Sequence, residues 1–111
     1  MTLSAWVNFQ QFNSLGTIWE SVNSTSDGWR GFALLFDASG SNLQFLDYTG
    51  SGYNTSLSAP TTDLTAGTWA QIVITRATNS CAMFVNGVKV AFETGLTPYA
   101  KPCLLYTSRC V

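Results

Sequence analysis

The sequence predicts an all-β domain, a sandwich or barrel of short antiparallel strands, and two observations support this. Residues 69–90 read as two successive hairpins, because a β-rich run, a polar turn and a second apolar run are followed by Asn86-Gly87. Asn-Gly supplies the positive backbone angles of a two-residue type I′ turn, whose twist matches the strands it joins. Elsewhere, short apolar runs bounded by Gly, Ser, Asn and Asp recur, and no segment has a 3.6-residue apolar period.

The first two runs are a half-buried strand and a second strand that ends in a polar loop. Residues 2–9 alternate in character, and their apolar face consists of Leu3, Ala5, Val7 and Phe9. Such alternation predicts a strand with one face on the core. Residues 16–22 form the second run, and the polar residues 23–28 are predicted to be a loop.

The next two runs are predicted to pair as a hairpin. Residues 31–37 are apolar on both faces, as expected for a central strand. The turn-forming residues 38–42 return the chain into residues 43–48. A flexible loop is expected at 49–54, before a short strand at 55–58 and the connection that leads to Trp69.

Three segments resemble one known family. Thr2-Leu3-Ser4-Ala5-Trp6-Val7 is similar to an early strand of the laminin-G-like members of the concanavalin A-like lectin/glucanase superfamily. Residues 64–68 resemble the loop that enters the family's Trp strand, and Trp69 to Val90 resembles that strand with its Asn-Gly hairpin. The resemblance implies an antiparallel jelly-roll β-sandwich. It implies less about activity, because members of the superfamily bind glycans, proteins or calcium, or cut polysaccharides.

The two ends of the chain suggest an incomplete domain. Residues 103–111 and a following stop can be back-translated as TGT CTC TTA TAC ACA TCT AGA TGT GTA TAA. With the preceding base, this is the transposon mosaic end CTGTCTCTTATACACATCT followed by its own reverse complement. We therefore expect residues 1–102 to be a partial laminin-G-like domain and residues 103–111 to be a non-native, adapter-derived tail. Laminin-G-like domains are usually longer, so a jelly roll incomplete at both ends is expected.

Charge and hydropathy exclude two kinds of partner. Five Lys and Arg residues oppose six Asp and Glu residues, and the net charge is −1. Such a chain has no basic stripe to neutralise phosphates, so a nucleic-acid partner is not expected. No apolar run approaches the roughly 20 residues that a membrane helix needs, so no membrane span is expected either. Oligomeric state cannot be read from the sequence.

The sequence does not predict an enzyme. It contains no histidine, which excludes Ser-His-Asp and Cys-His catalytic arrangements. Glucanases of the resembled superfamily carry a Glu-x-Asp-x-x-Glu strand, but no Asp follows Glu20 or Glu93 by two residues. Cys81 lies within an apolar run and is expected in the core.

No cofactor is evident, and calcium remains open for the intact domain. Asp27, Asp47 and Asp63 are expected at or near loops, where hard oxygen ligands suit Ca²⁺. They are spread along the chain without a D-x-D-x-D pattern, so capping of turns or solvation is the favoured interpretation.

Aromatic side chains beside loops are the candidates for glycan contacts. The C–H faces of sugars stack on Trp and Tyr, while their hydroxyls bond to Asn, Asp and Arg; the alternative is that Trp29 and Tyr48 fill the core or pack under a loop. Trp6, Trp19 and Trp69 are expected in the core. The predicted ligand-binding residues are Trp29, Arg30, Asp47, Tyr48, Tyr53 and Asn54.

The resemblance implies a non-catalytic recognition module, with a glycan or glycoprotein surface as its partner. Its expected location is an extracellular, cell-surface or phage-tail (virion) protein. One alternative is a structural or protein-interaction spacer in an adhesin or virion fibre. The other is a fragment of a polysaccharide hydrolase whose carboxylates lie outside this sequence.

Overall fold

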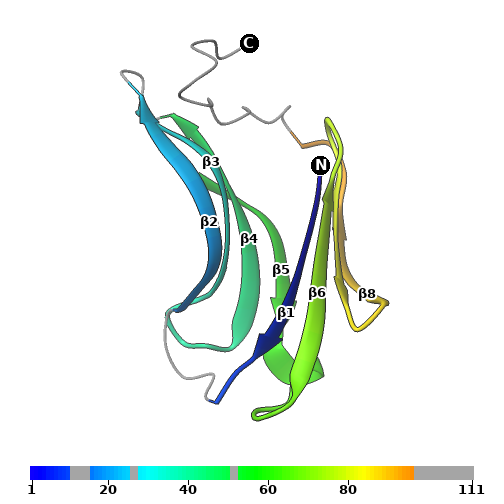
Figure 1. The fold of residues 1–111 in the computed structure, drawn as a ribbon. Coiled ribbons are helices and arrows are strands. Elements are labelled where there is room, and N and C mark those ends of the chain that lie inside the picture. Colours follow the sequence, from blue (N-terminus) through cyan, green and yellow to red (C-terminus); the bar gives the residue numbers. More distant parts are fainter. Residues whose placement is uncertain (11–15, 26–27, 51–52, 97–111) are drawn as a thin grey trace.

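The fold is a two-layer β-sandwich (Figure 1). The structure is a computed structural model that describes residues 1–10, 16–25, 28–50 and 53–96. For residues 23–25, 28–30, 49–50 and 53–56 the description covers the backbone alone. Eight strands and one short 3₁₀ helix, but no α-helix, occur within these ranges. The predicted all-β class is therefore confirmed.

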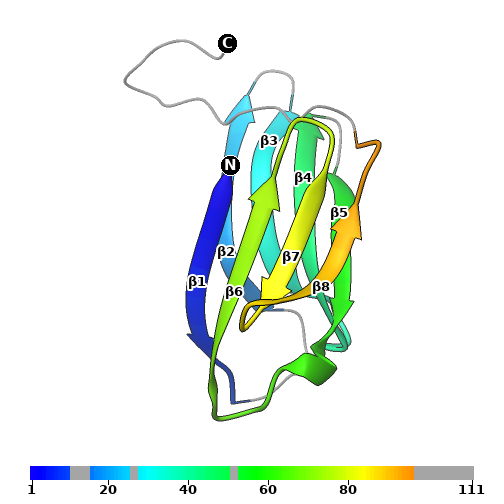
Figure 2. The same ribbon diagram turned by 90° about the vertical axis from the view of Figure 1, so that its right-hand side faces the viewer.

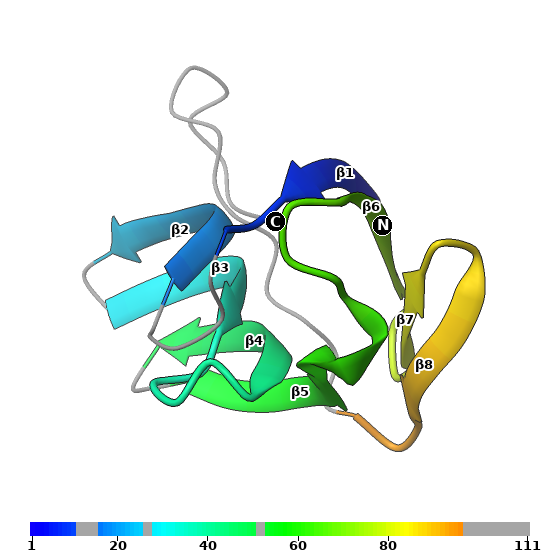
Figure 3. The ribbon, with the colours of Figure 1, turned by 90° about the horizontal axis from the view of Figure 1, so that it is seen from below.

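Each layer is an antiparallel sheet of four strands (Figure 3). Sheet A has the order β1-β6-β7-β8, and sheet B has the order β2-β3-β4-β5. Strand β1 pairs with β6. The early strand and the Trp strand, both of which resemble the family, therefore lie side by side. The strands of sheet A are β1 (Thr2–Asn8), β6 (Trp69–Arg76), β7 (Cys81–Val85) and β8 (Val88–Glu93), and those of sheet B are β2 (Gly16–Thr25), β3 (Gly28–Phe36), β4 (Asn42–Gly50) and β5 (Tyr53–Pro60).

The core lies between the facing sides of the two sheets. On β3 the side chains of Phe32, Leu34 and Phe36 alternate into it, and on β6 those of Ile72 and Ile74 do the same. Phe32 stacks on Phe45 with ring centroids 5.6 Å apart. The predicted core position of Cys81 is confirmed, since 2% of it is exposed. Burial raises the pKa of its thiol to about 12, which favours the neutral thiol, and Cys81 packs in the core as an apolar group.

The two predicted hairpins of sheet A are confirmed. Strands β6 and β7 pair from Ile72–Val85 to Arg76–Cys81, and β7 pairs with β8. Asn86 and Gly87 have φ angles of 50° and 83°, as a type I′ turn requires. The turn is held to β6, because the backbone N–H of Gln71 donates to Asn86 Oδ1 at 2.9 Å.

The predicted hairpin of β3 and β4 is confirmed, and Asp37 organises its turn. Asp37 Oδ1 accepts hydrogen bonds from Ser39 Oγ at 2.8 Å and from the backbone N–H of Ser41 at 3.0 Å. Its Oδ2 accepts from Asn42 Nδ2 at 2.7 Å. The bonds from Asn42 and Ser39 lower the pKa of Asp37 to about 2, because they favour the ionised carboxylate.

Two predicted loops are shorter than expected. Strand β2 continues to Thr25 and β3 begins at Gly28, although residues 23–28 were predicted to be a loop. Likewise β4 extends to Gly50 and β5 starts at Tyr53, although a loop was expected over residues 49–54. Inter-strand pairing overrides the weak strand propensity of Ser, Asn and Gly at both places.

Candidate functional site

Strand pairing brings the backbones of all six predicted ligand-binding residues to one end of sheet B. Tyr48 lies directly opposite Gly31 on one side and Tyr53 on the other. Asp47 lies opposite Phe32 and Asn54. Trp29 and Arg30 precede Gly31 on β3. We call this group of Trp29, Arg30, Asp47, Tyr48, Tyr53 and Asn54 the Tyr48 cluster.

The structure describes the side chains of only part of this cluster. The structure gives only the backbone of Trp29, Arg30, Tyr53 and Asn54. The side chain of Tyr48 is half-buried. Their predicted glycan contacts therefore remain predictions. All six residues lie within strands, although Tyr53 and Asn54 were predicted to be in a loop.

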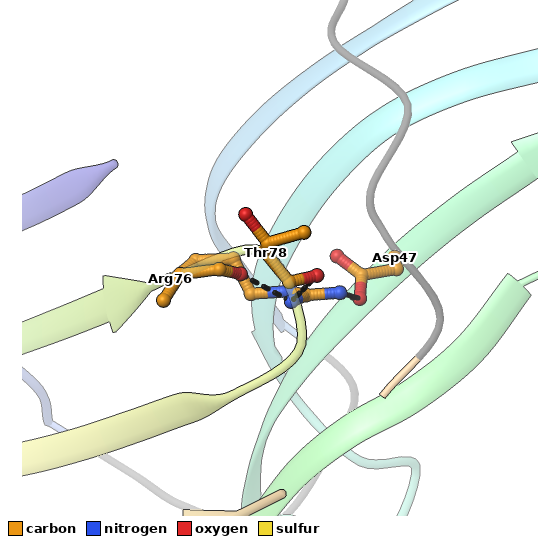
Figure 4. A network of polar contacts seen from close by, with 4 residues as sticks. Asp47, Arg76 and Thr78 are labelled. Carbon is orange, nitrogen blue, oxygen red and sulfur yellow. Dashed lines mark hydrogen bonds and ion pairs between the residues drawn. The ribbon is translucent and has the colours of Figure 1, made fainter. Parts of the chain in front are cut away.

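Asp47 differs most from its expected exposed position. It lies within β4 and is 5% exposed, and its carboxylate faces into the sandwich. Asp47 Oδ2 accepts hydrogen bonds from Arg76 Nη2 at 3.0 Å and from Arg76 Nε at 3.3 Å (Figure 4). Burial of the carboxylate without this guanidinium would be very costly, which explains the pairing.

Arg76 extends the ion pair into a network that reaches the turn after β6. Its Nη1 donates to the backbone oxygens of Ala77 at 2.6 Å and Thr78 at 3.1 Å. The residue is 1% exposed. A single side chain thereby links sheet A, sheet B and the β6–β7 turn at the level of the Tyr48 cluster. Sequence analysis did not find this pair, since residues 47 and 76 are remote in sequence.

Gly31 allows β2 and β3 to approach closely beside Tyr48. Its φ angle is 138°, which L side chains rarely adopt, and a Cβ at this position would lie 1.9 Å from the backbone oxygen of Ser21. The neighbouring backbone cannot make room as the end of a flexible side chain could. A glycine is therefore required at this position.

Sheet A, which faces the viewer in Figure 2, presents a second candidate surface on its outer side. Two exposed tryptophans lie on this sheet. Trp6 is 63% exposed and Trp69 is 62% exposed, so their predicted place in the core is wrong. The third tryptophan of that prediction, Trp19, does pack against the core. The strand period explains the difference, because Leu3, Ala5 and Val7 turn inward on β1 and leave Trp6 facing outward. The alternation of inward and outward residues on this strand can be predicted from the sequence.

The two tryptophans are neighbours on this face. Trp6 lies opposite Gln71, and Trp69 lies opposite Asn8, so the tryptophans form a diagonal pair on adjacent strands. Diagonal partners are about 7–8 Å apart, within reach of aromatic side chains. By strand register, the outer face of sheet A consists of Thr2, Ser4, Trp6, Asn8, Trp69, Gln71, Val73, Thr75, Ala82, Phe84, Lys89 and Phe92.

The opposite end of the same face is hollowed. A cavity of about 280 Å³ is lined by residues that include Thr2, Thr75, Ser80 and Phe92. Lys89 Nζ lies 4.9 Å from the centroid of the Phe92 ring, a cation–π contact. Between this hollow and the tryptophans, Gln71 Nε2 donates to Ser4 Oγ at 3.3 Å.

The side chains that could hold a metal ion are described for part of the chain. Among the described residues, no three His, Cys, Asp or Glu side chains lie close enough to hold a metal ion. Asp27 lies outside the described residues. Calcium therefore stays a prediction. No helix in the described ranges is long and apolar enough to cross a membrane.

The fold agrees with a comparison against known families. The profile described as the concanavalin A-like lectin/glucanases superfamily, Laminin_G_3, matches residues 1–105. No curated protein and no solved structure matches the chain.

Proposed function

The chain belongs to the Laminin_G_3 family of the concanavalin A-like lectin/glucanases superfamily, and we propose that it binds glycans as a non-catalytic recognition module. Membership supports a lectin-like or interaction module in general. The choice of a glycan rests on one further observation, the assembly of the Tyr48 cluster from three adjacent strands. We propose that the module belongs to a larger extracellular, cell-surface or phage-tail protein, as laminin-G-like domains often do.

By strand register Trp29, Tyr48 and Tyr53 share one face of sheet B, and aromatic rings at these positions can stack on the C–H faces of a pyranose ring. Arg30 and Asn54 take register positions on the opposite face, together with Asp47, so they are not part of this stacking surface. These residues stand on paired strands, which hold binding groups more rigidly than loops do.

We assign Asp47 a different part in the same proposal. Its carboxylate is held by Arg76 inside the sandwich, so it does not offer its oxygens to a sugar in the surrounding solvent. It is a positioning residue, because the ion pair fixes β4 next to Tyr48.

The proposal predicts that removal of the cluster aromatics abolishes glycan binding. The full chain is first screened against an array of neutral and acidic glycans, and the best ligand is immobilised on a column. Trp29→Ala, Tyr48→Ala and Tyr53→Ala should each weaken retention about tenfold or more, as expected when an aromatic anchor is lost. Ser58→Ala is a matched control, since Ser58 is exposed on β5 of the same sheet.

Two different outcomes would refute the choice of binding site and the binding of glycans itself. Unchanged retention in all three variants would refute the Tyr48 cluster as the site. A chain that retains no glycan at all would refute glycan binding, and a structural or protein-interaction role would then be favoured.

A further inference from the structure

We propose that the outer face of sheet A is a second binding surface, which takes an uncharged, β-linked polysaccharide chain across Trp6 and Trp69. This surface is the side of sheet A that faces away from the core and from sheet B, so it is separate from the Tyr48 cluster (Figure 2). The proposal does not depend on that cluster.

Folding does not explain two tryptophans at these positions. Each is more than 60% exposed, and the inward-facing neighbours already fill the core. A Trp side chain can bury 150–250 Å² against a partner. Two such side chains on adjacent strands therefore leave a large apolar area accessible, and they lie on paired strands that fix their positions.

The charge of the face defines the kind of partner. Among the described residues of the outer face, Lys89 is the one charged side chain, and it contacts the Phe92 ring. The hollow is also lined by Met1, whose terminal ammonium donates to the backbone oxygen of Arg76 at 2.8 Å. Without a carboxylate or a cluster of cations, the face has no complement for a uronic acid, a sulfated sugar or a charged protein surface. An uncharged ligand loses no ion hydration when it binds there.

The polar groups of the face suit a polyhydroxylated ligand. The amide of Gln71 and the hydroxyl of Ser4 lie between the tryptophans and the hollow, already bonded to each other at 3.3 Å. Further hydroxyls, those of Thr2 and Thr75, line the hollow beside Phe92. Hydroxyl and amide groups interleaved with aromatic rings match a sugar, which presents apolar C–H faces and a polar edge.

The length of the face favours a chain over a single sugar. Trp69 and Thr75 are six residues apart on β6, which corresponds to about 20 Å at about 3.3 Å per residue. A β-linked glucan or mannan is extended and exposes flat C–H faces, so successive rings could stack on the tryptophans while the chain runs toward the hollow.

Three polymers test the proposal: two cellulose ethers, one with an uncharged and one with a charged substituent, and an uncharged galactomannan. The full chain is run on native gels that contain hydroxyethyl cellulose, carboxymethyl cellulose or the galactomannan. We expect at least one of the two uncharged polymers to retard the protein, and retardation by carboxymethyl cellulose to be weaker than by its uncharged counterpart. Trp6→Ala and Trp69→Ala should each raise the apparent Kd about tenfold or more.

Val88→Ala is the matched control, because Val88 is an apolar side chain, 65% exposed, whose strand partner Val85 faces the core. Absence of retardation by both uncharged polymers, or equal retardation of both Trp variants and the unmodified chain, would overturn the proposal. The alternative occupant of the face is a second copy of the chain, which sedimentation velocity would detect as a dimer. If Trp6→Ala and Trp69→Ala convert such a dimer to monomer, the polysaccharide proposal is overturned.

Discussion

At the scale of single residues, Gly31 shows how sheet B depends on the absence of a side chain. A Cβ there would meet the backbone oxygen of Ser21 at 1.9 Å, and the φ angle of 138° adds strain. We expect Gly31→Ala to lower the free energy of unfolding by about 3 kcal/mol or more, measured by urea denaturation.

Gly67→Ala separates the clash from the strain. Gly67 also has a positive φ, 77°, but no atom lies within 4 Å of its Cβ position. This variant should lose only about 1 kcal/mol, the usual cost of placing an L residue in the left-handed region. Equal losses for Gly31→Ala and Gly67→Ala would contradict the close approach of β2 and β3.

The tryptophans show what residue type alone leaves undecided. Trp6, Trp19 and Trp69 were all expected in the core, because large aromatic residues are usually well buried. Burial depends on the strand face, and Trp6 and Trp69 are on the outward face. Asp47 shows the converse, since an acidic residue expected near a loop is buried by a partner far along the chain.

At the scale of elements, the β3–β4 hairpin should be sensitive to acid through Asp37. The pKa of this carboxyl in the folded chain is about 2, below its ordinary value of 3.8. Since the folded state favours ionised Asp37, its contribution to stability is complete above pH 5. It is lost as the pH falls through the range from about 4 to 2.

Thermal melting of the unmodified chain and Asp37→Ala should show this dependence. We expect the variant to melt at a lower temperature at pH 6, and the difference to shrink steadily between pH 5 and pH 2. Ser39→Ala removes one of the hydrogen bonds and should show a smaller effect of the same sign. A difference in melting temperature that does not change with pH would contradict this role for Asp37.

The strands themselves were largely predictable, whereas their ends were not. Three local patterns each predicted an element correctly: the alternation of residues 2–9, the apolar run 31–37 and the turn residues Asn86-Gly87. Residues 23–25 and 53–54 read as loop, but they are strand because a neighbouring strand offers them hydrogen bonds. Local composition carries no information about that neighbour.

At the scale of the whole molecule, the pair of Arg76 and Asp47 connects the two sheets. Their side chains are 1% and 7% exposed, and Arg76 also holds the turn after β6. Removal of one partner leaves an uncompensated buried charge, so Asp47→Ala and Arg76→Met should each destabilise the chain by about 3–5 kcal/mol.

A double-mutant cycle measured by urea denaturation tests the coupling. The variant that carries both Asp47→Leu and Arg76→Met should be more stable than either Asp47→Leu or Arg76→Met alone, because no unpaired charge remains. Additive losses in the double variant would contradict a direct coupling between the two side chains.

The sequence by itself determined the β class, most strands, the type I′ turn and the resemblance that the family profile supports. These features are local, because alternation and turn chemistry act over a few neighbouring residues. Only the tertiary structure decided which strands are neighbours, that Asp47 meets Arg76, and that the Tyr48 cluster gathers at one end of sheet B. It also decided that Trp6 and Trp69 adjoin on an exposed face. Strand order and register join residues that are remote in sequence, so no local pattern can encode these contacts.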